Sequence, residues 1–201
     1  MAFISQVPMT ELQAVNMLLA AIGEAAVSSL ETATTVEVTQ AKNLLSNTNR
    51  AIQQKGWHFN TEWDVVMTLD LTSRVPIASN VLSIMIPNKL TTLRGREGSP
   101  FLYDLENNTF TFGSAPNNAV TITLLDFVDT PHTFRQYVTV RSARIFQDEI
   151  IGQVSAEQIN RIEESEAYAD LLDDETDRAG YNVGYSDIEM YNITKKHRKL
   201  W

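Results

Sequence analysis

The sequence contains no cysteine, few glycines and prolines, and no long apolar run. Without cysteine, disulfides and thiolate metal sites are excluded, and the chain fits a reducing compartment. Eight glycines and six prolines in 201 residues do not make a collagen-like or low-complexity chain. The apolar runs are only a few residues long, and the first residues lack a charged segment followed by an apolar one. We therefore expect no membrane span and no secretion signal.

Positive charge is also scarce. The chain carries 25 acidic and 16 basic residues, which gives a formal net charge of −9. Because phosphate neutralisation by lysine and arginine supplies most of the affinity for nucleic acid, this balance argues against tight DNA or RNA binding. An acidic wall still lets DNA pass without holding it. The hydrophobic fraction of 43% suffices for one good core or two small ones.

Motifs of catalysis and metal binding are missing too. There is no Walker sequence, dinucleotide fingerprint or nucleophile elbow. The segment Gly95-Arg-Glu-Gly98 lies between strand candidates with no helix after it, so a turn is favoured over a nucleic-acid clamp. His58, His132 and His197 are far apart and lack metal-site spacing. His58 and His132 lie at junctions between helical and strand-rich parts, where we expect packing or a hydrogen bond.

Two helices are predicted before residue 58. Thr10-Glu-Leu-Gln13 has the spacing of a capping box, and the helix that follows ends at Gly23. A second helix runs from about Thr35 to Lys55 and stops at Gly56. Apolar residues recur at three- and four-residue spacing in both. They are Leu12, Val15, Leu18, Leu19 and Ile22, then Val38, Ala41, Leu44, Leu45, Thr48 and Ile52.

Residues 59–128 have the pattern of short strands separated by turns and prolines. A hairpin is predicted where Phe101–Tyr103 and Thr109–Phe112 flank a loop whose asparagines tolerate positive φ. A small antiparallel sheet or sandwich should result. The other predicted strands are Val65–Leu69, Val81–Ile86 and Val120–Leu125.

Two more helices are predicted after residue 128. Pro131 suits a first helical turn, and a helix extends from there to about Ile151. Ser155-Ala-Glu-Gln158 is a second capping box, which opens a helix through roughly Asp177 with a strongly acidic solvent face. One face of the first carries Phe134, Tyr137, Val138, Arg141, Ile145 and Phe146. The apolar positions of the second include Ile159, Ile162, Ala169 and Leu172.

These patterns together predict an α+β fold. The N- and C-terminal helices should form an antiparallel helical bundle, with a small antiparallel β-domain inserted in it. We assign residues 1–58 and 129–180 to the helical domain, 59–128 to the β-domain and 181–201 to a C-terminal arm.

Two groups of carboxylates allow two interpretations. Glu163-Glu164-Glu166 and Asp173-Asp174-Glu175 fit the paired acids of glycoside hydrolysis, which needs carboxyls roughly 5 to 10 Å apart. A solvated acidic helix face explains them as well and is favoured. Neighbours in sequence point in different directions on a helix, and no aromatic sugar platform is interleaved.

The C-terminal arm is basic and aromatic. Its run from Lys195 to Lys199 suits phosphates, a membrane surface or an acidic protein groove, or serves as a solubilising tail. Tryptophan, tyrosine and arginine dominate interface energies, which favours a protein contact with a partner or a neighbouring subunit. The residues predicted to make it are Tyr191, Lys195, Lys196, Arg198 and Trp201.

Several short motifs resemble one known family. They are Val15-Asn16, Ile22-Gly23-Glu24, Asn49-x-x-Ile52-Gln53-x-x-Gly56-Trp57-x-Phe59-Asn60, and Pro131-x-x-Phe134-Arg135 with Tyr181-Asn182. This set is similar to the tail tubular protein A family, the head-to-tail adaptor of T7-like short-tailed phages. The resemblance covers about Thr10 to Asn182. The strand region shares only its general β-rich character with the family, and the residues after Asn182 match no pattern of the family.

The resemblance implies a structural virion protein and not an enzyme. From the residues, neither a cofactor nor a metal is expected. The resemblance also implies a homo-oligomer that forms a dodecameric ring between the portal protein and the tail nozzle protein (tail tubular protein B). The ring would be assembled in the host cytoplasm and located in the virion tail. The helical domain would build and line the ring, and the β-domain would lie outward and toward the nozzle. DNA would pass transiently, without specific binding. Glu163, Glu164 and Glu166 are the candidates for an acidic channel wall or an inter-subunit contact, because an acidic lumen repels DNA.

Two rival functions belong to other classes. Some members of this family have been proposed to hydrolyse glycans as well as to build the tail, but this sequence supplies acids without a site. A nucleic-acid-binding regulator is disfavoured by the charge balance, since it would need tight, salt-sensitive binding of duplex DNA.

Overall fold

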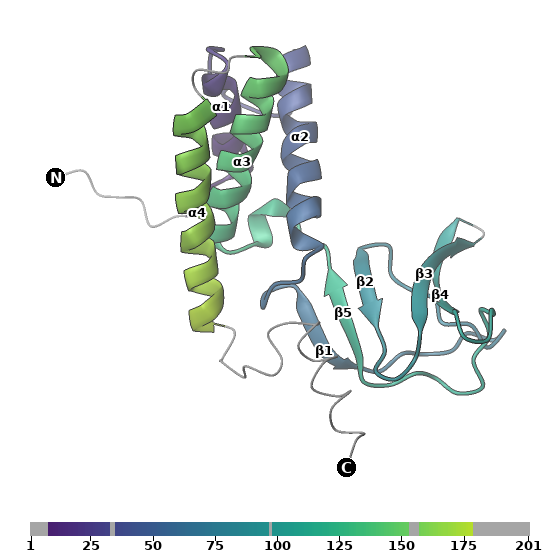
Figure 1. Ribbon diagram of the computed structural model, residues 1–201. Helices are drawn as coiled ribbons and strands as arrows, with labels where there is room; N and C mark the ends of the chain where they lie inside the picture. The colour runs from purple at the N-terminus through teal and green to yellow at the C-terminus, as the bar shows by residue number, and fades with distance from the viewer. Residues whose placement is uncertain (1–7, 33–34, 97, 153–156, 179–201) are drawn as a thin grey trace.

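The structure, a computed structural model, describes residues 8–32, 35–96, 98–152 and 157–178 (Figure 1). Over this part of the chain the helices are α1 (Glu11–Ala21), α2 (Val36–Gln53), α3 (His132–Ile150) and α4 (Glu157–Arg178). The strands are β1 (Thr61–Val65), β2 (Val81–Met85), β3 (Thr91–Arg96), β4 (Ser99–Asp104) and β5 (Ala119–Thr123), and a short 3-10 turn, η1 (Phe127–Asp129), precedes α3. The α+β fold class is therefore confirmed.

Local signals start and end the first two helices as predicted. The backbone nitrogen of Gln13 donates to Thr10 Oγ1 at 3.2 Å, and the backbone nitrogen of Thr10 donates to Gln13 Oε1 at 2.9 Å, which completes the capping box. Gly23, just after α1, has a φ of +82°, the left-handed conformation that ends many helices. Thr35 caps α2 through the backbone nitrogen of Val38.

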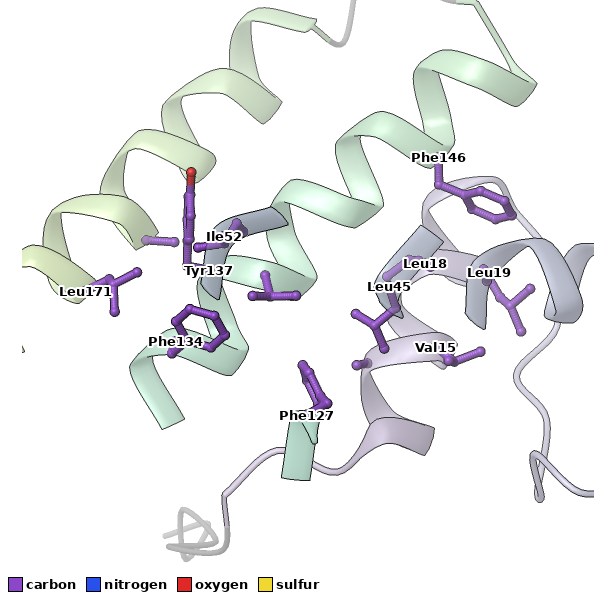
Figure 2. Packing of buried hydrophobic residues seen from close by; sticks show 14 of the residues in the cluster. Val15, Leu18, Leu19, Leu45, Ile52, Phe127, Phe134, Tyr137, Phe146 and Leu171 are labelled. Carbon is purple, nitrogen blue, oxygen red and sulfur yellow. The ribbon is translucent and has the colours of Figure 1, made fainter. Parts of the chain in front are cut away.

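The helices pack around α3, which contacts α1, α2 and α4, while α1 also contacts α2. Figure 2 shows side chains from all four helices and from η1 turned into one apolar interior. Phe134 is fully buried there and meets the rings of Trp57 and Phe59 edge to face. The buried side chains of this helical core include Val15, Leu18, Leu19, Leu45, Ile52, Trp57, Phe127, Phe134, Tyr137, Val138, Phe146 and Leu171.

The predicted buried face of α4 is wrong. Ile162 and Leu172 are 57% and 42% exposed, and α4 packs instead through Ala167 and Leu171, with Tyr168 half-buried. The side of α4 that faces α3 also carries Glu164 and Asp174, which bind arginine and threonine side chains of α3. The predicted capping box at Ser155 and the side chain of Ile159 lie outside the described residues.

Strands β1, β5 and β2 form a three-stranded antiparallel sheet in that order. The predicted strands at Val81–Ile86 and Val120–Leu125 correspond to β2 and β5. The predicted strand Val65–Leu69 is wrong, because β1 ends at Val65 after an irregularity at Asp64, whose φ is +56°. Beyond it, the backbone nitrogen of Met67 donates to the carbonyl of Pro116.

Strands β3 and β4 form a separate antiparallel hairpin. The turn predicted at Gly95–Gly98 is corrected: Gly95 and Arg96 belong to β3 and pair with β4, and Gly98, just before β4, has a φ of +79°. The predicted pairing of β4 with Thr109–Phe112 is corrected: the turn after Asp104 exists, with Asn108 at a φ of +53°, but only isolated bridges follow it. A second buried cluster lies among the strands and consists of Met67, Val75, Ile77, Ile84, Ile86, Leu102, Phe112 and Ala119. The bounds of the two domains stay a prediction.

Candidate assembly surfaces

A buried polar network joins the end of α2 to the segment after β5. The side chain of Gln53 is fully buried, and its Nε2 donates to the carbonyl oxygen of Leu125 at 2.8 Å. The backbone nitrogen of Leu125 donates back to Gln53 Oε1 at 2.8 Å, and Gln53 Nε2 also donates to Asn49 Oδ1. Every polar atom of the Gln53 side chain is therefore satisfied inside the protein.

Asn60 extends this network to β5. Its Oδ1 accepts from the backbone nitrogen of Trp57 at 2.8 Å, and its Nδ2 donates to the carbonyl oxygens of Gln53 and Thr123 at 3.0 and 3.1 Å. The indole nitrogen of Trp57 donates to the carbonyl of Ile52 at 2.9 Å. The polar residues of the Asn49 to Asn60 motif thus fix the helices to the sheet, and this motif is structural.

Gly56 lies in the same junction at a position that strongly favours glycine. Its φ is +79°, a conformation that L side chains rarely adopt. A Cβ at this position would also lie 2.8 Å from Cδ1 of Ile122 in β5. Both the turn and the close approach of β5 require glycine here.

An ion-pair cluster holds α4 against α3. Arg141 Nη1 lies 2.6 Å from Glu164 Oε1, and Arg144 Nε pairs with the other carboxylate oxygen. Arg144 also reaches Asp148 at 2.9 Å. Only 14% of the Glu164 side chain is exposed, so this carboxylate stabilises the packing of α4 on α3 within one subunit. Of the three glutamates predicted for a channel or subunit contact, Glu164 faces α3, whereas Glu163 and Glu166 are exposed.

The far end of α4 is tied to the junction by two carboxylates. Thr133 Oγ1 donates to Asp174 Oδ2 at 2.9 Å, and Arg178 pairs with the same side chain. The backbone nitrogen of His58 donates to Glu175 Oε1 at 2.9 Å, and His58 Nδ1 contacts Glu175 Oε2. Burial alone would raise the pKa of Asp174, but hydrogen bonds from Arg178 and Thr133 outweigh it and lower that pKa.

Both junction histidines therefore have structural roles, as predicted. His58 binds Glu175, and the Nδ1 of His132 accepts from the backbone nitrogen of Met9 at 3.4 Å. Among the described residues, no group of three or more histidine, aspartate or glutamate side chains is arranged to hold a metal ion. None of the described helices combines the length and apolar character needed to cross a bilayer.

Glu164 does not have the surroundings of a glycosidase's catalytic acid. A catalytic acid of that kind is kept protonated by apolar surroundings, whereas Glu164 accepts from two arginines. Glu163 and Glu166 are exposed to solvent. A shallow groove of about 190 Å³ lies beside Glu163, lined mainly by Met17, Ala21, Val140 and Ala143. Its lining is largely apolar and holds no second carboxylate.

A family model described as tail tubular protein matches residues 12–181. The chain belongs to the tail tubular protein family. The match spans the described helices and strands as well as the junction motif, and it assigns the chain a structural role in a phage tail, as a component of the virion. No curated protein matches the chain.

The arm residues predicted to contact a partner lie outside the described residues and beyond the range that the family model matches. They are Tyr191, Lys195, Lys196, Arg198 and Trp201.

Proposed function

We propose that this tail tubular protein is the adaptor subunit that joins the portal to the tail nozzle of a short-tailed phage. Twelve-fold repetition would close a ring around the path of the ejected DNA, assembled in the host cytoplasm before it joins the virion. The family match carries the proposal, because it covers the helices and the strands together. The chain would act as a building block and not as an enzyme.

The junction supports a role that connects two structures. An adaptor has to keep its portal-facing and nozzle-facing surfaces in a fixed relation while DNA is ejected. The bonds of Gln53 to Leu125 and of Asn60 to Thr123 hold the helices and the sheet together at a buried point. In this proposal the helices build the ring and the strands face outward, toward the nozzle protein.

The charge of the chain supports the passage of DNA without specific binding. A net charge of −9 repels phosphates, and the exposed Glu163 and Glu166 suit a surface that meets the channel or the neighbouring subunit. We expect no duplex DNA binding at physiological salt in an electrophoretic mobility assay. Tight binding that weakens steeply with added salt would contradict this part of the proposal.

The basic arm is proposed to dock on the portal or on an adjacent subunit. Tyr191, Lys195, Lys196, Arg198 and Trp201 combine the cationic and aromatic groups that dominate interfaces. Deletion of residues 186–201 should weaken portal binding and leave the fold of the monomer intact, because the described residues build both buried clusters from positions between Ala14 and Leu171. Portal affinity that does not change after the deletion would remove this contact from the proposal.

The ring itself is tested by mass photometry of the protein alone and mixed with the portal of its parent phage. A ring in either sample, and above all on the portal, would support the adaptor function. A protein that stays monomeric and binds neither portal nor nozzle would overturn it.

A further inference from the structure

Two straight lines of exposed side chains run along the helical part, one on α2 and one on α4. The α2 line, called the donor line here, consists of Gln40, Asn43, Asn47, Arg50 and Gln54. The α4 line, called the acid line, consists of Glu163, Glu166, Asp170, Asp173 and Asp177. Spacings of three and four residues keep each line on one side of its helix. Each line spans about 21 Å at 1.5 Å per residue.

The two lines match in spacing as well as in length. In the donor line the steps from Gln40 to Gln54 are three, four, three and four residues, and the steps from Glu163 to Asp177 are the same in the same direction. Two helices laid side by side and parallel would therefore bring each member of one line opposite a member of the other. Arg50 would lie opposite Asp173.

The chemistry of the two lines is complementary. Amide and guanidinium groups donate hydrogen bonds, whereas ionised carboxylates only accept them, and such charge-assisted bonds are the strong ones. The donor line contains no acidic residue. An acid line placed against another acid line would bring like charges together, which disfavours a symmetric contact between two α4 helices.

The lines of one chain cannot meet each other. Figure 1 shows α3 between α2 and α4, and α3 contacts both of them. The donor line lies opposite the buried face of α2, which includes Ala41 and Leu45. The two helices run in the same direction, because His58, just after α2, binds Glu175 near the end of α4. A donor line that meets the acid line therefore has to come from another molecule.

We propose that the acid line of α4 is the docking site for the donor line of α2 on a second copy of this chain. This inference rests on the proposed ring, and it assigns Glu163 and Glu166 to the subunit contact. The contact is heterologous, so it repeats in one direction around a ring. Neighbours in a large ring differ by a small rotation, which keeps the two helices parallel as their spacing requires. The exposed Val36 and Ile162, at the starts of the two helices, lie at the same end of this contact.

Disulfide trapping tests the contact, because the chain has no cysteine of its own. The variant Asn47→Cys/Asp170→Cys is assembled on the portal, oxidised and separated on a non-reducing gel. We expect a ladder of covalent multimers. A mixture of the two single-cysteine variants should give dimers and nothing larger. The matched control, Ser114→Cys/Asp170→Cys, moves one cysteine to an exposed site among the strands and should give no ladder.

The outcomes separate this inference from the function on which it rests. Rings on the portal without a ladder would overturn the α2–α4 contact and leave the adaptor function standing. No ring and no ladder would overturn both. A ladder of the same length from the Ser114→Cys/Asp170→Cys control would show unspecific cross-linking and would also overturn the contact.

Charge exchange gives a second, independent test. Arg50→Glu should lower ring formation by about tenfold or more, since it sets two like charges together in the interface. Arg50→Glu/Asp173→Arg should restore ring formation. Lys42→Glu makes the same charge change on α2 away from the donor line and should have little effect. Equal loss in Lys42→Glu, or no rescue by the double variant, would contradict the proposed register.

Discussion

Gln53 and Leu125, 72 positions apart in the chain, are joined by two hydrogen bonds of 2.8 Å. The buried amide side chain of Gln53 donates one bond to the backbone of Leu125 and accepts the other from it. Replacing Gln53 with methionine keeps the size of the side chain but removes the acceptor for the backbone nitrogen of Leu125 and the shorter of two donors to its carbonyl oxygen, which keeps Asn49 Nδ2 at 3.3 Å. Groups left without a partner at a buried site cost about 1–3 kcal/mol each. We expect Gln53→Met to lower the free energy of unfolding in urea by roughly 2–4 kcal/mol.

The neighbouring residue provides the matched control for that change. Gln54 is exposed and lies just after the end of α2, so Gln54→Met should alter stability by less than about 0.5 kcal/mol. Equal losses in the two variants would show that the Gln53 network does not hold the junction.

Gly56 should not tolerate a side chain. Alanine there would adopt a left-handed conformation, which costs about 1–2 kcal/mol, and its Cβ would press on Ile122. We expect Gly56→Ala to lower the free energy of unfolding by about 2–4 kcal/mol. Gly113→Ala is the control, since nothing lies within 4 Å of its Cβ position. A Gly56→Ala protein as stable as Gly113→Ala would refute the required close approach.

Ser142 offers a stabilising substitution. Its hydroxyl is the buried side-chain oxygen for which the described residues provide no hydrogen-bond partner, and the side chain is fully buried in α3. Ser142→Ala should raise the melting temperature, because it removes a buried unsatisfied group and adds helix propensity, together about 1 kcal/mol or more. Ser46→Ala, at an exposed position of α2, measures the propensity term alone. If Ser142→Ala raised the melting temperature no more than Ser46→Ala, the hydroxyl of Ser142 would have a hydrogen-bond partner.

Asp174 should contribute to acid sensitivity. Its folded-state pKa is lowered below the ordinary value of 3.8, because bonds from Arg178 and Thr133 outweigh the effect of burial. A carboxyl with a lowered folded pKa stabilises the protein above its unfolded pKa, and this contribution disappears as pH falls through the folded value. We expect the melting temperature of Asp174→Asn to fall less than that of the parent protein between pH 5 and roughly pH 3. Asp170→Asn, exposed on the same helix, should behave like the parent, and identical acid profiles for all three would contradict the assignment.

The sequence predicted those elements whose signals are local. The capping box at Thr10 and the left-handed glycines at Gly23 and Gly56 act within a few residues, so they could be read without tertiary structure. Strand β3 was missed because its sequence mixes threonine, arginine and glycine and has no clear strand pattern. It is a strand because its backbone pairs with β4.

The candidate site could be predicted only in part, because its contacts too depend on residues far apart in the sequence. Glu163, Glu164 and Glu166 look alike in sequence, and only the positions of Arg141 and Arg144 on α3 decide that Glu164 faces inward. The donor line on α2 was also missed, since exposed amides carry no motif. It is recognisable only when the position of α4 on the other side of α3 is known (Figure 1).

The place of α3 in the helical core sets an order for folding during synthesis. Phe134, Val138 and Phe146 complete a core begun by α1 and α2, but residues 54–131 leave the ribosome between the two halves. At about 5–20 residues per second, the first two helices wait on the order of ten seconds with their apolar faces uncovered. The strand cluster, whose residues lie between Met67 and Ala119, is complete before α3 is made. We therefore expect the nascent chain to fold from its middle outward, with the last helices closing the protein.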